Sequence, residues 1–450
     1  MNDVKILQIG EGNFIRAFFD YYIQLSNEFY GYYGSIVMCQ PRTNTKVIDA
    51  LKAQNNEFDV IVRGKLEGIL IDARKRVTSI ANCYDTVSEW DKVVETACLD
   101  TLEIIVSNTT EAGIEYVATD KMEDAPMVSY PAKLTTLLYE RFKKGKSGVV
   151  ILPLELIETN AETLKIYVLK HAIRWGLDDD FIEYIYNECS FCNTLVDRIV
   201  TGHIDGDKDP CSVYCEPYYS FVIQGDERCK KAFPYVEGMN IIFTDDTKPY
   251  MDSKVRILNG LHTMMVHAAY IHGFDIVRDV IMNAEYSDIA HNCLEEEILP
   301  TVLLADDVKR RFANSVIERF ENPYIDHKLL DIALNSISKY QARCMSTVLD
   351  YYQLYSKQPL YMSKALAYLI RFYRGEFKDG KYIGTRIKNG KPEEYEIRDS
   401  KQVLEAFEKA YKTDNPVKAI MSDSSIWEID MSKLDGFYEQ VKEFYDKIEI

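Results

Sequence analysis

Hydrophobic residues form short, β-branched runs in the first half of the chain. The first run, residues 4–9, leads directly into Gly10-Glu11-Gly12 and then into a helical pattern at residues 15–19. Further candidate strands cover residues 35–39, 59–62, 102–106 and 148–152. Because helical segments separate these runs, and parallel strands need crossover connections, the pattern predicts a mostly parallel sheet covered by helices.

After about residue 250 the spacing of apolar residues changes to three and four, which indicates helices. The segments with this spacing are residues 287–304, 306–320 and 327–352, whereas residues 378–384 indicate a surface hairpin or loop. The polar, proline-containing stretch 244–250 separates the two patterns. We therefore expect an α/β domain over residues 1–246 and a mainly α-helical domain over residues 247–450.

The composition narrows the class of protein. A chain of 450 residues with 47% hydrophobic and 28% charged residues is globular and long enough for two domains. Its net charge of -18 argues against nucleic acid or an anionic membrane surface as a partner. The first residues show no basic segment followed by an apolar core, so we expect a cytoplasmic protein whose ten cysteines are reduced thiols.

Gly10 and Gly12 fill the first two positions of the G-x-G-x-x-G pattern, and Ile15 fills the third. Glycine lets the backbone approach a pyrophosphate closely, while the following helix presents free N–H groups to it. A plain strand-to-helix turn fits the same two glycines. Where an acidic residue often binds the adenosine ribose, this chain has Gln40, which suits ribose hydroxyls, and Arg42, which suits a 2′-phosphate, so NAD and NADP both stay open.

Lys254, Asn259 and His262 follow one another in a helical pattern. In a regular α-helix, Asn259 would lie about 140° and His262 about 80° around the axis from Lys254, so the three share a broad face. Interconversion of an alcohol and a ketone needs a group that exchanges the hydroxyl proton and donors that hold the oxygen. Lysine and asparagine meet these needs; a solvated lysine, a packing asparagine and a core histidine are the alternative.

The spacing K-x4-N-x2-H resembles the catalytic signature of the long-chain mannitol dehydrogenase family. Other segments that resemble the family, in order, are residues 8–18, 107–114, 129–135, 195–202, 248–250 and 319–325. The resemblance implies a Rossmann-like N-terminal domain, a helical substrate domain and NAD-dependent reduction of a small sugar acid, D-tagaturonate, to D-altronate. Fructuronate or a polyol as substrate is the alternative, and the oligomeric state stays open.

The resemblance also assigns roles to residues. Lys254 is the expected general acid and base, Asn160 and Asn259 hold the reacting oxygen, and His262 orients the substrate and the lysine. Asp197 is an expected active-site carboxylate, with a structural salt bridge to Arg198 as its alternative. Lys339 and Arg343 are candidates for binding the substrate carboxylate. The expected cofactor-binding residues are Gly10, Gly12, Asn13, Phe14, Gln40, Arg42, Asn108 and Thr109.

The spacing of four cysteines suggests a structural metal site, which is an alternative to the dehydrogenase interpretation. Cys189 and Cys192, followed by Cys211 and Cys215, have a spacing close to that of a structural zinc site. A zinc-stabilised, non-catalytic nucleotide-binding protein is therefore an alternative from a different class. The mechanism implied by the resemblance uses lysine and asparagine in place of a Lewis acid, so we expect no metal.

Overall fold

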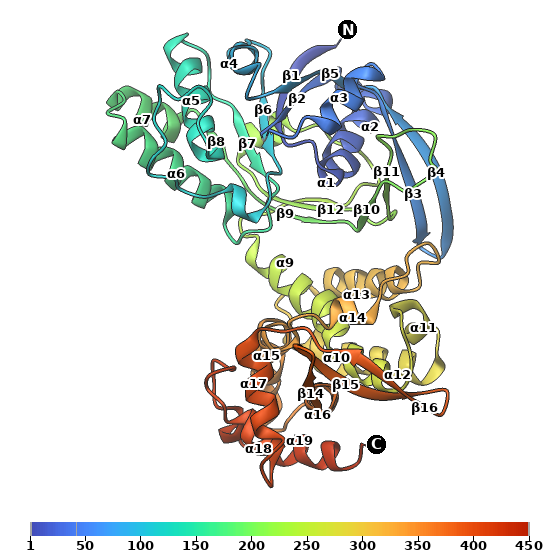
Figure 1. Cartoon of the computed structure of the whole chain (residues 1–450). Coiled ribbons are helices and arrows are strands. Elements are labelled where there is room, and N and C mark those ends of the chain that lie inside the picture. The colour runs from blue at the N-terminus through green and yellow to red at the C-terminus, as the bar shows by residue number, and fades with distance from the viewer. Residues whose placement is uncertain (1, 42, 449–450) are drawn as a thin grey trace. The chain divides into compact units, whose positions relative to one another are not determined.

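The computed structural model describes residues 2–41 and 43–448 of the chain. It divides into two compact units, Met1–Lys248 and Pro249–Ile450 (Figure 1). Within the described ranges, no helix combines the length and the apolar character needed to cross a membrane. The expected fold class, a Rossmann-like domain followed by a mostly helical domain, is confirmed.

A six-stranded parallel sheet forms the centre of the first unit. Its order is β5 (Ile80–Asp85), β2 (Gly34–Gln40), β1 (Asp3–Ile9), β6 (Ile104–Ser107), β7 (Val150–Pro153) and β8 (Ser190–Phe191). Every pair of neighbours in this sheet is parallel. The strand order reverses between β1 and β6, and in such sheets ligands bind outside the carboxyl ends of the strands at this point.

Successive side chains of β1 enter two different hydrophobic cores, because strand side chains alternate between faces. Ile6 belongs to one core, whereas Leu7 and Ile9 belong to the other. The helices that contribute to the core of Leu7 are α4 (Trp90–Ala97), α5 (Tyr130–Lys143), α6 (Asn160–Arg174) and α7 (Asp179–Asn187). The helical segments that contribute to the core of Ile6 are α1 (Asn13–Ile15), η1 (Arg16–Asp20), α2 (Tyr21–Phe29), α3 (Lys46–Ala53) and α8 (Glu227–Ala232).

The prediction that residues 59–62 belong to the parallel sheet was wrong. They lie in β3 (Phe58–Leu66), which pairs antiparallel with β4 (Ile69–Val77) in a separate sheet. That sheet has the order β10 (Val200–Gly202), β11 (Val213–Cys215), β3, β4, and a third sheet has the order β13 (Ile241–Phe243), β12 (Ser220–Gln224), β9 (Asn193–Asp197). Strand β4 escaped prediction because most of its side chains are charged or exposed, which leaves little hydrophobic alternation.

The second unit is mainly helical. Its helices are α9 (Lys248–Ser253), η3 (Lys254–Gly260), α10 (Leu261–Ile271), α11 (Val277–Ile281), α12 (Ala284–Cys293), η4 (Leu294–Ile298), η5 (Leu299–Thr301), α13 (Asp306–Phe320), α14 (Leu329–Ile332), α15 (Ser336–Tyr355), α16 (Leu360–Phe372), α17 (Lys401–Ala410), α18 (Pro416–Met421), η6 (Met431–Lys433) and α19 (Phe437–Asp446). The helix expected over residues 327–352 is broken, because Asn335 has a positive φ of 54°.

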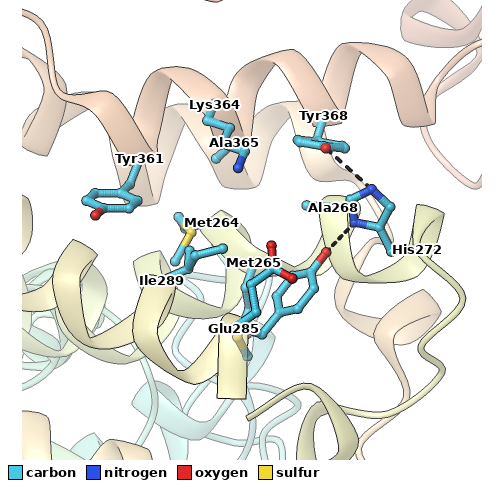
Figure 2. Close-up of a pocket in the computed structure, with 11 residues that line it drawn as sticks. Met264, Met265, Ala268, His272, Glu285, Ile289, Tyr361, Lys364, Ala365 and Tyr368 are labelled. Atoms are coloured by element: carbon cyan, nitrogen blue, oxygen red, sulfur yellow. Dashed lines mark hydrogen bonds between the residues drawn. The ribbon is translucent and has the colours of Figure 1, made fainter. Parts of the chain in front are cut away.

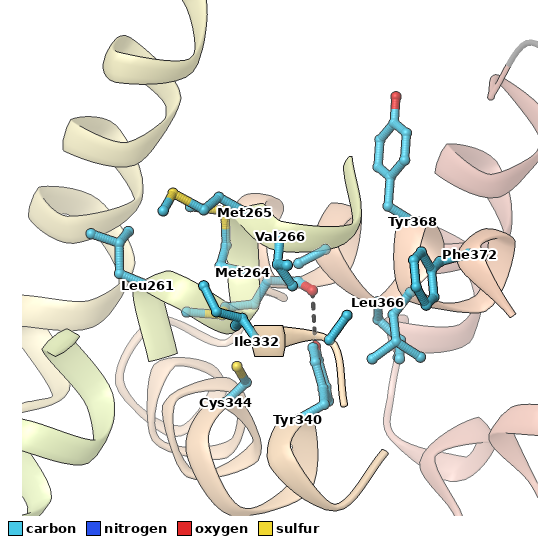
Figure 3. Close-up of a cluster of buried hydrophobic side chains, with 14 of the residues drawn as sticks. Leu261, Met264, Met265, Val266, Ile332, Tyr340, Cys344, Leu366, Tyr368 and Phe372 are labelled. Atoms are coloured by element: carbon cyan, nitrogen blue, oxygen red, sulfur yellow. Dashed lines mark hydrogen bonds between the residues drawn. The ribbon is translucent and has the colours of Figure 1, made fainter. Parts of the chain in front are cut away.

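The core of the second unit is built around α10, α15 and α16. Figure 3 shows Leu261 and Met264 of α10 near Tyr340 and Cys344 of α15, and the Tyr340 hydroxyl donates to the Met362 carbonyl over 2.9 Å. A hairpin sheet of β14 (Gly375–Lys378), β15 (Lys381–Lys388) and β16 (Lys391–Glu396) completes the unit and contains the expected surface hairpin.

Arg141, near the end of α5, is a fully buried cation that satisfies main-chain carbonyls. Its Nε donates to the Ser147 carbonyl over 2.7 Å, and its terminal nitrogens donate to the carbonyls of Ala97, Leu99 and Leu102. These bonds join α5 to the segment between α4 and β6. A buried carbonyl without a donor costs free energy, so the fold depends on this side chain.

We expect Arg141→Met to lower the free energy of unfolding by about 2–4 kcal/mol, because four carbonyls each lose one hydrogen bond. The measurement is urea denaturation followed by circular dichroism. Lys143→Met is the control, since Lys143 on the same helix is exposed and makes a surface ion pair with Glu140 and a contact with the Tyr139 ring. Equal midpoints for the two variants would contradict this role of Arg141.

Candidate functional site

The glycine turn after β1 requires glycine at one position and leaves open space at the other. Gly10 has a φ of +124°, and a Cβ there would lie 2.7 Å from the Asn108 carbonyl oxygen. A Cβ on Gly12 would meet no atom within 4 Å, and Gly12 starts the helix without a side-chain cap. Gly10 is therefore needed by the fold itself, whereas the space beside Gly12 and the uncapped N–H groups suit an approaching anion.

Arg16 holds the glycine turn in place. Its Nε donates to the Glu11 carbonyl over 2.9 Å, and one terminal nitrogen donates to Asn13 Oδ1 over 2.8 Å. The other terminal nitrogen donates to the Cys211 carbonyl, which ties the turn to the segment before β11. Because Arg16 is buried, its bonds stabilise the loop rather than present a charge to solvent.

Asp20 lies behind the turn at the end of η1 and is fully buried. Burial raises the pKa of Asp20 to about 8, although the amide of Gln8 and the charge of Arg16 act in the opposite direction. Gln8 Nε2 donates both to the Gly10 carbonyl, over 3.0 Å, and to Asp20 Oδ2, over 3.4 Å. A neutral carboxyl at this place puts no negative charge behind a turn that suits an anion.

The other expected cofactor residues lie at the same edge of the sheet. Phe14 stacks on Phe18 with ring centroids 5.0 Å apart. Asn108 and Thr109 directly follow β6, where Thr109 donates from N and Oγ1 to Glu155 Oε1 over 2.8 Å each. Gln40 ends β2 and its amide donates to the Asn44 carbonyl. Arg42 lies outside the described residues.

Asn160 and Asp197 also lie in the first unit, each at an element boundary. Asn160 begins α6 and is fully buried; its Nδ2 donates to the carbonyls of Pro153 and Glu155, and its Oδ1 accepts from the Thr194 N–H over 3.0 Å. Asp197 is the buried last residue of β9. In this conformation the Asn160 amide joins β7 to β9, and the expected roles of both residues at the reacting oxygen stay predictions.

In the second unit, Lys254 and Asn259 lie within the π-helix η3 (Lys254–Gly260), which continues α9 and leads into α10. In a π-helix the N–H of one residue bonds to the carbonyl five residues earlier, so residues five apart lie about one turn apart on the same side of the helix. The sequence projection assumed a regular α-helix and separated the two side chains too widely. The π turn brings Asn259 to the same side of the helix as Lys254, and His262 follows three residues later on α10.

His262 is buried between aromatic rings and cationic side chains. Its ring stacks on Phe320 with centroids 4.1 Å apart and meets His327 edge to face at 5.2 Å. Burial holds the pKa of His262 well below its usual value, and neighbouring positive charge adds to this lowering. The groups that supply this charge are His327, Arg319, Arg343 and Lys339. His262 Nε2 has no hydrogen-bond partner among the described residues.

Helix α15 carries the expected substrate-binding cations close to this histidine. Lys339 and Arg343 lie one turn apart and so share a face. The helix comes near η3 because residue 260 is glycine: a Cβ there would lie 3.1 Å from the Arg343 carbonyl oxygen. Burial, followed by the charge of Arg343, lowers the pKa of Lys339, whose Nζ donates to the Ile332 carbonyl over 2.8 Å.

The sequence analysis missed His327 and Arg319 as neighbours of His262. His327 lies within a segment expected to be one continuous helix, and Arg319 was quoted only as part of a family-like segment. Their proximity to His262 depends on how α10, α13 and α15 pack, which hydrophobic spacing does not reveal. Arg319 adds positive charge near His262 in a chain of net charge -18.

The four cysteines considered for zinc have separate surroundings. Cys189 neighbours Tyr184, Cys192 neighbours Cys229, Cys211 neighbours Arg16 and Cys215 neighbours Arg198. All ten cysteines of the chain are buried and free. Among the residues that the structure describes, no group of three His, Cys, Asp or Glu side chains is placed to hold a metal ion.

A separate pocket of the second unit lies between α10, α12 and α16 (Figure 2). His272 connects its walls, since Nδ1 pairs with the Tyr286 hydroxyl over 2.5 Å and Nε2 with the Tyr368 hydroxyl over 3.4 Å. The cavity of about 40 Å³ holds a few waters but not a six-carbon acid. It shares no lining residue with the expected site.

The raised pKa of Asp20 gives a pH prediction for stability. The folded chain binds this proton more tightly than the unfolded chain, so stability falls as pH rises from about 4 towards the folded pKa of about 8. The loss is at most about 1.4 kcal/mol per pH unit. We expect Asp20→Asn to remove this part of the slope, and thermal midpoints of both proteins at pH 5 and pH 8 measure it. Parallel pH curves would contradict the assignment.

Comparison with known proteins agrees with this architecture. Residues 4–236 match the mannitol dehydrogenase Rossmann domain, and residues 246–449 match the mannitol dehydrogenase C-terminal domain. The chain is 34% identical to an altronate oxidoreductase of Halalkalibacterium halodurans, over 98% of this chain and 90% of that protein. It is 37% identical to the altronate oxidoreductase of an Enterobacter species, over 97% of this chain and 92% of that protein.

Two solved structures share the fold. A D-sorbitol dehydrogenase in substrate-free form has a TM-score of 0.80 at 18% identity, covering 98% of this chain and 93% of its own. The mannitol 2-dehydrogenase of Pseudomonas fluorescens, in a ternary complex with NAD and D-mannitol, has a TM-score of 0.69 at 17% identity, covering 99% and 92%. With both of its domains matched by the family models, the chain belongs to the mannitol dehydrogenase family.

Proposed function

We propose that this chain is an NAD-dependent oxidoreductase that reduces D-tagaturonate to D-altronate and catalyses the reverse oxidation. The observation that carries the proposal is identity of 34–37% with altronate oxidoreductases over nearly the whole chain. Free cysteines and a small sugar-acid substrate fit a cytoplasmic enzyme without nucleic acid or membrane partners.

The edge of the parallel sheet fits a dinucleotide. Gly12 leaves room for a pyrophosphate, and the first N–H groups of the following helix offer it hydrogen bonds. Gly10, Asn13, Phe14, Asn108 and Thr109 form the surrounding edge, and Gln40 fixes the loop after β2. When bound, NADH supplies the hydride for the ketone carbon.

The residues of the second unit transfer the proton and bind the substrate. Lys254 in its protonated form gives a proton to the carbonyl oxygen as that oxygen gains charge, and takes it back in the oxidation. Asn259, which the π turn brings to the same side of the helix as Lys254, donates a hydrogen bond to the same oxygen. His262 orients the substrate, while Lys339 and Arg343 attract its carboxylate.

A spectrophotometric assay tests the substrate and the cofactor together. Oxidation of NADH and of NADPH is followed with D-tagaturonate, D-fructuronate and D-fructose. We expect the highest kcat/KM with NADH and D-tagaturonate. A higher value with D-fructuronate would reassign the substrate, and turnover of none of the three ketoses would overturn the proposal.

Replacing Lys254 by Ala is expected to lower kcat by about 10²–10⁴-fold, because the proton donor is lost. The dissociation constant of NADH, measured by fluorescence titration, should stay within twofold. Lys401→Ala, at an exposed lysine of the same unit, serves as the control and should leave kcat unchanged. Nearly unchanged turnover in the Lys254 variant would remove Lys254 from the mechanism.

The two glycines of the turn separate a folding requirement from a binding requirement. In Gly10→Ala the added Cβ meets the Asn108 carbonyl at a positive φ, so we expect a lower thermal midpoint. In Gly12→Ala the Cβ meets no protein atom, so we expect an unchanged midpoint and NADH binding weakened about tenfold or more. Full NADH affinity in the Gly12 variant would show that no pyrophosphate approaches this turn.

A further inference from the structure

His327 is held by main-chain bonds at a fixed place between α13 and α14. Its carbonyl accepts a hydrogen bond from the Val277 N–H over 2.9 Å, and the next residue, Lys328, forms a β-bridge with Ile276. Its side chain is half-buried and meets the His262 ring edge to face. The backbone therefore fixes the position of this imidazole relative to His262.

The two imidazoles have hydrogen-bonding capacity that the protein does not use. His262 is only 7% exposed, and its Nε2 has no hydrogen-bond partner within the part of the chain that the structure describes. Among residues 2–41 and 43–448, no hydrogen bond to a ring nitrogen of His327 is formed. Since buried polar groups are nearly always satisfied, an unpartnered nitrogen at this depth points to a ligand.

The charges around the pair indicate the chemistry of that ligand. Burial lowers the pKa of His327, Asp331 raises it and Lys339 lowers it further. Lys339 itself lies near Arg343, Arg398 and Asp399. Arg319 of α13 adds a further positive charge near His262. Arg398 forms an ion pair with Asp331 over 3.2 Å. Of the other groups named, three are cations and one is a carboxylate, which favours a negatively charged ligand that accepts hydrogen bonds.

We propose that His327 is a specificity-determining residue that donates a hydrogen bond to the carboxylate of the substrate. The inference rests on the proposed function and deepens it. Lys339 and Arg343 attract the carboxylate by charge, and the imidazole of His327 fixes its direction. His262, one ring away, faces the part of the substrate that reacts at Lys254. A neutral ketose lacks the group that His327 binds, so the residue favours a sugar acid over a polyol or simple ketose.

If His327 had only a structural role, its replacement would have a different effect from the one expected for carboxylate binding. If His327 only paired with Asp331 to stabilise the loop, its loss would lower the thermal midpoint and affect acidic and neutral substrates alike. If it binds the carboxylate, its loss raises KM for the acid and leaves kcat close to the original value. The ratio between acidic and neutral substrates therefore separates the two roles.

The test compares His327→Leu, which removes both ring nitrogens, with His327→Gln, which keeps a donor of similar reach. For D-tagaturonate we expect KM to rise about tenfold or more in the leucine variant, with partial recovery in the glutamine variant. The values for D-fructose and the KM for NADH should stay within twofold. His291→Leu is the matched control, because His291 is an exposed histidine of α12 bonded to the Ser287 carbonyl.

Calorimetric titration with D-altronate measures the same site without turnover. Weaker binding to the leucine variant than to the unmodified protein supports the inference even if no ketose acid is reduced, in which case only the proposed function fails. An unchanged KM for D-tagaturonate, or equal losses for D-tagaturonate and D-fructose, would overturn it. If the leucine variant does not fold, the glutamine variant must still show the selective rise in KM.

Discussion

The close approach of η3 and α15 at Gly260 is the constraint on which the second unit of the molecule depends. No side chain fits between the Gly260 Cα and the Arg343 carbonyl without displacing one of them. This contact brings Lys339 and Arg343 to the helix that carries Lys254, Asn259 and His262. Hydrophobic packing of α10 against α15 and α16 stabilises the arrangement, with Tyr340 and Cys344 in its centre (Figure 3).

In the first unit, the parallel sheet positions several loops at one of its edges. Its strand β1 is buried on both faces, so the two cores fix the strand and leave its carboxyl end to carry the glycine turn. Arg16 and Gln8 donate hydrogen bonds to carbonyls of the turn, and Glu155 accepts from the Thr109 N–H in the loop after β6. Among the described residues, Gln8 Oε1 and Asp20 Oδ1 behind the turn have no hydrogen-bond partner. The space beside Gly12 is open, since a Cβ there would meet no atom within 4 Å.

Much of this could be predicted from sequence, for identifiable reasons. Strand β1, the glycine turn and α13 (Asp306–Phe320) have strong local signals, and α13 was expected with the bounds that the structure shows. Strand β4 lacked such a signal because nearly all of its side chains are exposed or only partly buried. The break at Asn335 depends on a single residue with positive φ, which asparagine permits but does not require. The surroundings of His262 come from helices far apart in the chain, so no local pattern could reveal His327.

The π turn between Lys254 and Gly260 also bears on how this helix tolerates changes in length. Each of its hydrogen bonds spans one residue more than an α-helical bond. The segment therefore accommodates one extra residue between α9 and α10, and deletion of one residue here would leave an ordinary α-helix in which the side chains before and after the segment keep nearly the same orientation. A one-residue gap placed here in an alignment thus shortens the spacing between Lys254 and Asn259 and leaves the faces of α9 and α10 in register.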